Sequence, residues 1–255
     1  MSVRAKKHLG QHFLKDENMA AQIASALEHS SQIAFEIGPG MGSLTKYLLQ
    51  DWGNKLWVSE VDNESVEYLK KHYPELTSRI IEGDFLQHDL NALFGGEKIS
   101  LIGNFPYNIS SQILFKALDY KETVVQIVGM FQREVAKRIC SPPGNKDYGI
   151  LSVLLQAHYE TEYLYDVPPC SFIPPPKVNS GVIRLKKKPQ SYIGCDEVLF
   201  KKVVKTAFNQ RRKMLSNALS SLLEGRKIEE KIGHLRAEQL SWEDFVQLTN
   251  AIQQL

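Results

Sequence analysis

The feature that most constrains the fold is a regular alternation of short apolar runs with helical patterns between about residues 17 and 140. The apolar runs predict strands at 32–37, 55–61, 79–83, 99–103 and 123–131, and the patterns between them predict helices near 43–51, 63–72 and 110–118. Strands that alternate with helices form a mostly parallel sheet covered on both faces, with right-handed crossovers. We therefore predict an α/β fold.

The last third of the chain has a different pattern. Two further strand-like runs, at about 156–165 and 179–186, flank the proline-dense segment VPPCSFIPPPKV. Beyond LKKKPQSYIGCDE the pattern is helical from about residue 196 to the end. A chain of 255 residues is long enough for two domains. We predict domains at residues 1–188 and 189–255, the second of them smaller and all-α.

Composition excludes several classes of protein. The chain is 43% hydrophobic and 24% charged, as is usual for soluble proteins, and no apolar run reaches the roughly 18 residues of a membrane span. The N-terminal segment lacks the apolar stretch of a secretory signal, so we expect a cytoplasmic protein. The three cysteines include no CxxC pair and the seven histidines no HExxH motif, which argues against a metal site.

The charge is unevenly distributed along the chain. Residues 1–185 contain 18 basic and 21 acidic residues, whereas residues 186–255 contain 13 and 8. Arg4, Lys6 and Lys7 add a short basic arm. A basic arm and a basic C-terminal part suggest a polyanionic partner, although charge alone equally fits a solvated surface.

A glycine-rich turn follows the first predicted strand, in the sequence EIGPGMGSLT (36–45). Gly38 and Gly40 permit a tight turn and the close approach of a ligand to the backbone. Ser43 stands where the dinucleotide-binding fingerprint requires a glycine, and Pro39 lacks an amide that a pyrophosphate could use. The turn therefore predicts a ligand site without phosphates, with a plain tight turn as the alternative.

Carboxylates end the next two predicted strands. Glu60 and the following Val61 come about 20 residues after the glycine turn, a spacing that suits the hydroxyls of a ribose. Asp84 and Phe85 follow the third strand, where an acid can accept from an exocyclic amine beside an apolar ring. Each acid alone is more often a helix cap, but the ordered set predicts a nucleoside pocket.

The fourth predicted strand ends in NFPYNIS (104–110). The side-chain oxygen of Asn104 can accept a hydrogen bond from an amino group. Pro106 fixes the turn, so that the carbonyl of Phe105 can act as a second acceptor. Tyr107 offers a flat face on which a base can stack. The motif predicts a site for a nucleobase that carries an amino group.

These motifs resemble a known family over essentially the whole chain. The matching segments, in order, are GQHFL (10–14), EIGPGMGSLT (36–45), EVD (60–62), GDFL (83–86), NFPYNISSQIL (104–114), FQREVAKRI (131–139), FIPPPKVNS (172–180) and AFNQRRKML (207–215). The sequence resembles the bacterial small-subunit (16S) ribosomal RNA adenine N6,N6-dimethyltransferases of the kasugamycin-sensitivity type. The resemblance implies a Rossmann-like methyltransferase domain with a mostly parallel seven-stranded sheet.

The resemblance also implies a reaction and partners. Two adjacent adenines in the 3′-terminal hairpin loop of 16S ribosomal RNA would be dimethylated with S-adenosyl-L-methionine during late small-subunit biogenesis, by a monomeric enzyme. Implied cofactor positions are His12, Leu14, Gly38, Gly40, Glu60, Val61, Asp84, Phe85 and Asn104. Implied catalytic positions are Asn104, Phe105, Pro106, Tyr107 and, as a second clamp on the base, Phe172. Expected RNA contacts are Arg4, Lys6, Lys7, Arg211, Arg212 and Lys213. His12 departs from the asparagine that the family usually carries.

Three other hypotheses remain on the sequence alone. A large-subunit RNA dimethylase would share the fold and the NxPY turn, although FIPPPKVNS and the basic helical tail favour the small-subunit enzyme. A DNA adenine methyltransferase would usually carry a separate target-recognition domain. A non-catalytic assembly or transcription factor on the same scaffold would not need every motif position to be filled, as it is here.

Overall fold

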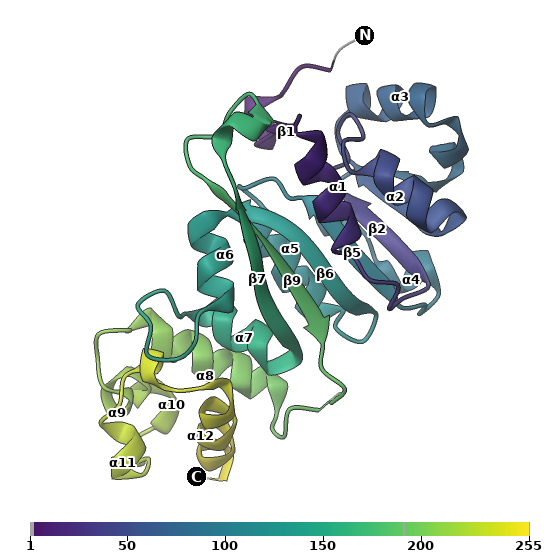
Figure 1. Cartoon of the computed structure of the whole chain (residues 1–255). Coiled ribbons are helices and arrows are strands. Elements are labelled where there is room, and N and C mark those ends of the chain that lie inside the picture. Colours follow the sequence, from purple (N-terminus) through teal and green to yellow (C-terminus); the bar gives the residue numbers. More distant parts are fainter. Residues whose placement is uncertain (1–2, 191, 255) are drawn as a thin grey trace. The chain divides into compact units, whose positions relative to one another are not determined.

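The computed structural model describes residues 3–190 and 192–254 and contains a mixed seven-stranded sheet (Figure 1). The strand order is β4-β3-β2-β5-β6-β9-β7. The strands are β2 (Ile33–Ile37), β3 (Leu56–Glu60), β4 (Ile80–Glu82), β5 (Ile99–Asn104), β6 (Val124–Gln132), β7 (Tyr159–Val167) and β9 (Ser180–Lys187). β2, β3, β4, β5 and β6 are joined by parallel pairings, and β9 runs antiparallel to β6. The predicted α/β fold and mostly parallel sheet are confirmed.

The centre of the sheet creates a crevice at its carboxyl edge. β2 is buried at all five residues, because both of its faces are covered, and it pairs with β3 on one side and with β5 on the other. The chain winds outward from β2 through β3 to β4 and then returns to β5, so the strand order reverses between β2 and β5. Ligands of open α/β sheets bind at such a switch point. The glycine turn after β2 and Asn104 at the end of β5 therefore meet there.

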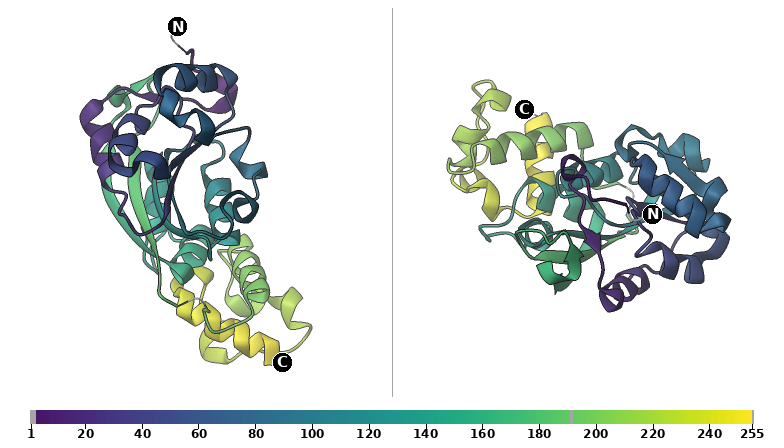
Figure 2. Two further views of the ribbon diagram at one scale, coloured as in Figure 1. Left: turned by 90° about the vertical axis from the view of Figure 1, so that its right-hand side faces the viewer. Right: turned by 90° about the horizontal axis from the view of Figure 1, so that it is seen from above.

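Helices flank the sheet on both sides (Figures 1 and 2). They are α1 (Glu17–Ser25), α2 (Thr45–Trp52), α3 (Asn63–His72), α4 (Leu90–Phe94), α5 (Ser110–Asp119) and α6 (Arg133–Cys140). Asp16 caps α1 by accepting from the Met19 amide, and Asp62 caps α3 by accepting from the Glu64 amide. None of the helices in the described ranges is long and apolar enough to cross a membrane.

A short ladder joins two distant parts of the chain. β1 (Phe13–Leu14) pairs antiparallel with β8 (Phe172–Ile173), and the Lys15 amide donates to the Ser171 carbonyl at 2.9 Å. Figures 1 and 2 show the N-terminal segment, in dark purple, beside the green turn that contains β8. No local sequence signal predicts this pairing, which brings residues 10–13 to the crevice.

The chain forms two compact units. The first comprises residues 3–136 and 162–187, and the second comprises residues 137–161 and 188–254. The second unit contains α7 (Ile150–His158), α8 (Glu197–Asn209), α9 (Leu215–Ala218), α10 (Ser220–Leu223), α11 (Glu230–Gly233) and α12 (Trp242–Gln254). α7 packs on α8 and α12. The predicted domain boundary at 188/189 lies next to one junction between the units, whereas residues 137–161, predicted in the first domain, group with the second unit.

Candidate active site

A hollow opens at the carboxyl edge of the sheet, within the first unit. Its lining residues are Leu9, Gly10, Gln11, His12, Phe13, Ile37, Gly38, Gly40, Ser59, Glu60, Val61, Gly83, Asp84, Phe85, Asn104, Phe105, Pro106, Tyr107 and Ile109. The space between its walls, together with the open solvent at its mouth, is about 670 Å³. The predicted glycine turn, carboxylates and NFPY motif are thus brought together around one hollow.

The glycine turn is required by geometry. Gly38 and Gly40 have φ angles of +69° and +58°, a region that other residues adopt with strain. A Cβ atom on Gly40 would also lie 2.8 Å from the ring of Phe13, which comes from β1. At Gly38 the nearest atom would be 3.9 Å away, on Pro106. The turn therefore brings bare backbone against the hollow and against the N-terminal segment.

The side chain of Glu60 is held in place by backbone amides. Its side chain is buried and accepts hydrogen bonds of 2.9 Å from the amides of Gly40, Val61 and Asp62. Burial raises the pKa of Glu60, and the three backbone hydrogen bonds oppose that rise. Each carboxylate oxygen can accept more than one hydrogen bond, so Glu60 keeps capacity for ligand hydroxyls.

A second buried acid, Glu36, lies behind the turn and was not assigned a role from the sequence. It is 1% exposed and accepts a hydrogen bond of 2.6 Å from the hydroxyl of Thr45. Burial, reinforced by the charge of Glu60, raises the pKa of Glu36 to about 8. Glu36 is therefore mostly protonated at neutral pH.

The remaining wall suits the base of a nucleoside. Asp84 ends one side of the hollow, with one oxygen accepting from the Leu86 amide at 2.9 Å. Val61, which is 49% exposed, and the largely buried Phe85 are the apolar residues beside these acids in the lining. Among the described lining residues, the acidic side chains are those of Glu60 and Asp84, and there is no lysine or arginine. A lining with acids and without lysine or arginine fits a cationic nucleoside better than a nucleotide.

The NFPY turn presents an oriented amide. The side-chain nitrogen of Asn104 donates to the backbone carbonyl of His12 at 2.7 Å. Because a carbonyl can only accept, this contact fixes which amide atom is nitrogen, and the oxygen of Asn104 remains an acceptor at the hollow. The Phe105 ring is buried, so the group that this residue can offer to a ligand is its backbone carbonyl. The Ile109 amide closes the turn by donating to the Pro106 carbonyl at 3.1 Å.

Tyr107 and His12 border a second hollow. The Tyr107 hydroxyl is hydrogen-bonded to that of Ser180 at 2.5 Å, and burial raises the pKa of Tyr107. The rings of His12 and Tyr107 lie 5.6 Å apart, at 31° to each other. The second hollow is lined by Ala5, Lys7, Gly10, Gln11, His12, Tyr107, Gln132, Pro174, Pro175, Pro176, Lys177 and Val178. It shares the wall of residues 10–12 and Tyr107 with the first hollow.

Two predicted site residues lie elsewhere. Phe172 is 1% exposed and packs in the hydrophobic core with Leu14, Met130 and Val182, because β8 turns this ring inward. Leu14 is likewise buried in that core, and neither residue lines the first or the second hollow. The expectation that Phe172 presents a free face to a base is corrected, and a clamp role would require β8 to move.

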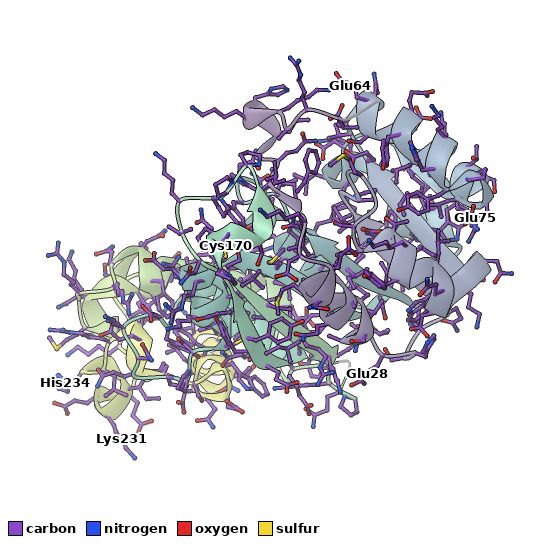
Figure 3. All side chains as sticks on the ribbon, turned by 45° about the horizontal axis from the view of Figure 1, so that its top comes forward. Glu28, Glu64, Glu75, Cys170, Lys231 and His234 are labelled. Atoms are coloured by element: carbon purple, nitrogen blue, oxygen red, sulfur yellow. The ribbon has the colours of Figure 1, made fainter. Side chains whose placement is uncertain are left out.

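One residue of the basic arm, Lys6, is held by acidic side chains. Lys6 donates to Asp62 and lies 3.3 Å from Glu64, whose side chain is labelled in Figure 3. Gln11 donates to the other oxygen of Asp62 at 3.2 Å. Burial would raise the pKa of Asp62, but the bonds from Lys6 and Gln11 prevail and hold it below its usual value. Lys6 is thus committed to the protein, whereas Arg4 and Lys7 are exposed.

In the predicted basic cluster of the second unit, Arg211 is paired, whereas Arg212 and Lys213 are exposed. Its residues lie in the turn after α8 rather than on a helix. Arg211 is ion-paired with Glu238 and donates to the carbonyl of Lys146, which uses its guanidinium within the unit. Arg212 and Lys213 are exposed.

Among the described residues, no cluster of three or more acidic, histidine or cysteine side chains could hold a metal.

The sheet order, the carboxylates after β3 and β4 and the NFPY turn after β5 define the chain as a Rossmann-like methyltransferase. Residues 2–254 match the model of the family described as ribosomal RNA adenine dimethylase. The chain belongs to this family. It is 54% identical, over all of both chains, to a protein of Porphyromonas gingivalis named ribosomal RNA small subunit methyltransferase A. A Flavobacterium johnsoniae protein of the same name is 53% identical, with 98% of this chain and 97% of that protein covered.

Solved structures agree on the fold. A dimethyladenosine transferase from Plasmodium falciparum matches with a TM-score of 0.77 at 24% identity, covering 93% of this chain and 96% of that chain. The 23S rRNA methyltransferase ErmE matches with a TM-score of 0.69 at 22% identity, covering 94% and 99%. The Rossmann-like methyltransferase fold predicted from the sequence is therefore confirmed.

Proposed function

We propose that this enzyme dimethylates two adjacent adenines in the 3′-terminal hairpin loop of 16S ribosomal RNA, late in the biogenesis of the small ribosomal subunit. The observation that carries the proposal is the oriented amide of Asn104. Its nitrogen is occupied by the His12 carbonyl, so its oxygen is presented as an acceptor beside the nucleoside hollow. The names of the relatives support the small subunit as the source of the RNA.

The first hollow is proposed to bind S-adenosylmethionine, which supplies an electrophilic methyl group when bound. Glu60 would accept from the ribose hydroxyls, and Asp84 from the amine of the cofactor's base. Val61 and Phe85 would pack on that base. The glycine turn at Gly38 and Gly40 supports this assignment, because it leaves backbone rather than side chains against the ligand.

The chain's own residues would act on the target adenine by positioning and electrostatics. The oxygen of Asn104 and the carbonyl of Phe105 would accept the N6 hydrogens, which favours a pyramidal nitrogen with an available lone pair. Tyr107 would stack on the base once it leaves its own stack, a step that costs least in a hairpin loop. Alignment in this way can supply a large part of the rate enhancement without a strong base.

The deciding experiment is a radiolabelled methyl-transfer assay with the purified full chain. Immature small subunits, large-subunit RNA and DNA would be compared as substrates, and the products digested to nucleosides. We expect N6,N6-dimethyladenosine from the small subunit alone. Methylation of large-subunit RNA or DNA in preference to the small subunit would refute the proposal, and no transfer to any of them would favour a non-catalytic assembly role.

A further inference from the structure

A side chain extends the backbone pairing of β1 with β8 by one hydrogen bond. The register that pairs Phe13 with Ile173 places His12 opposite Pro174. Proline has no amide hydrogen, so it cannot donate to a partner strand. At this position the ring Nδ1 of His12 is hydrogen-bonded to the Pro174 carbonyl at 2.8 Å. Because the carbonyl can only accept, Nδ1 carries the hydrogen.

His12 therefore makes two bonds to two different parts of the site. Its backbone carbonyl accepts from Asn104 at 2.7 Å, at the first hollow. Its imidazole bonds to the start of the segment Pro174–Val178, which lines the second hollow. The same ring lies 5.6 Å from that of Tyr107. One residue thus connects the amide acceptor, the stacking ring and the proline-rich segment.

We propose that the His12 imidazole is a positioning residue for the substrate RNA rather than a cofactor contact. It fixes the Pro174–Val178 segment against Tyr107 and so sets the width of the second hollow, through which a nucleotide reaches Asn104. This inference rests on the proposed function. It differs from the expectation drawn from the family resemblance, which placed residue 12 among the cofactor positions.

The backbone and the side chain of His12 make separate contacts, so the side chain can be tested alone. Removal of the imidazole leaves the backbone carbonyl, and hence the bond to Asn104, in place. Cofactor affinity and the orientation of Asn104 should then survive, while the segment from Pro174 loses its tether. A side chain with a cofactor role would show the opposite pattern.

The choice of substitution sharpens the test. The amide nitrogen of asparagine is one bond from Cγ, as Nδ1 is in histidine, so His12→Asn can restore the donor to Pro174. His12→Gln places its amide one bond further out, where it imitates Nε2 instead. His12→Ala removes the donor altogether. His234→Ala, an exposed histidine of the second unit labelled in Figure 3, is the matched control.

Steady-state kinetics on small subunits and titration calorimetry with S-adenosylhomocysteine separate the two roles. We expect His12→Ala to raise the KM for the RNA substrate about threefold to tenfold, which corresponds to the loss of one hydrogen bond. The Kd for S-adenosylhomocysteine should change less than about twofold. His12→Asn should return close to the wild-type KM, and His12→Gln should not. A tenfold weaker nucleoside Kd with unchanged KM for RNA, or equal behaviour of the asparagine and glutamine variants, overturns the proposal.

A second measurement does not depend on methyl transfer. Ring ¹⁵N–¹H correlation spectra of the free protein should show the Nδ1–H tautomer for His12, and in His12→Ala the ¹⁵N relaxation of residues 177–179 should report backbone motion of larger amplitude. An Nε2–H tautomer, or unchanged relaxation, would overturn the inference even if the enzyme is active. Failure of the wild-type chain to methylate any RNA would instead count against the proposed function, so the two failures are distinguishable.

Discussion

The Glu60 carboxylate accepts a hydrogen bond of 2.9 Å from the backbone amide of Gly40. The contact joins the end of β3 to the glycine turn after β2, so the acid proposed to bind the ribose also holds the turn that faces the ligand. Its other oxygen accepts from the amides of Val61 and Asp62. All three donors are backbone groups, and they fix the carboxylate before any ligand arrives.

Glu60→Gln is expected to weaken binding of S-adenosylhomocysteine by about tenfold to a hundredfold, as measured by titration calorimetry. The amide places an NH₂ group against either the Gly40 donor or the Val61 and Asp62 donors, and at least one of these hydrogen bonds is lost. Asp51→Asn, at an exposed carboxylate on α2, is the control. Equal affinity of wild type and Glu60→Gln would show that Glu60 does not contact the nucleoside.

Asn104→Ala is expected to reduce methyl transfer by at least about a hundredfold, because an acceptor at the reacting amine is lost. RNA binding, followed by filter retention of labelled small subunits, should stay close to that of the wild type. Asn54→Ala, at an exposed site in the same unit, controls for the substitution itself. Unchanged turnover with purified small subunits would remove Asn104 from the proposed mechanism.

Arg212 and Lys213 are expected to contact RNA phosphates, whereas Arg211 is expected to support the second unit. Neutralising Arg212 and Lys213 together should weaken RNA binding and reduce the slope of log affinity against log salt by roughly 2, because about one counterion is released per phosphate contact. Arg211→Ala should lower the midpoint of thermal unfolding, since it frees Glu238 and the Lys146 carbonyl.

The control for this pair is Lys55→Gln with Lys71→Gln, which removes the same charge from exposed positions of the first unit. It should leave the salt slope within error of the wild type. An unaltered slope in the Arg212 and Lys213 variant would mean that neither side chain touches a phosphate.

Glu36 should make stability depend on pH. Its pKa is raised from 4.5 to about 8, so the folded chain holds a proton that the unfolded chain releases, and the free energy of unfolding falls as pH rises between those values. Glu36→Gln should therefore match the wild type near pH 4.5 and exceed it at pH 8.5, by on the order of 1–4 kcal/mol. Urea unfolding of both proteins across this range measures the difference, and parallel curves would contradict the shift.

The sheet was predictable because its signals are local. Each buried strand reads as an apolar run of a few residues, and the turns after β2 and β5 carry glycine, proline and asparagine in positions that fix the backbone. The acids at the ends of β3 and β4 followed from their place after those runs. The prediction that these groups converge on one hollow depended on parallel strands sharing a carboxyl edge.

The contacts that complete the site were not predictable from such signals. β1 and β8 are two residues each and pair across most of the chain, so neither has a periodic pattern. α7 begins with a continuous apolar run and extends to His158, whereas the sequence predicts a strand from about residue 156. Buried helices and buried strands look alike over such short stretches. The burial of Phe172 and the pairing of Arg211 with Glu238 depend on tertiary packing that composition does not encode.

The ion pair between Lys6 and Asp62 fastens the N-terminal arm to the start of α3. The Asp62 side chain is fully shielded from solvent, so dissolved ions screen the pair far less than they screen surface contacts with RNA phosphates. Salt that strips RNA from the enzyme should therefore leave residues 6–11 fastened beside the nucleoside hollow.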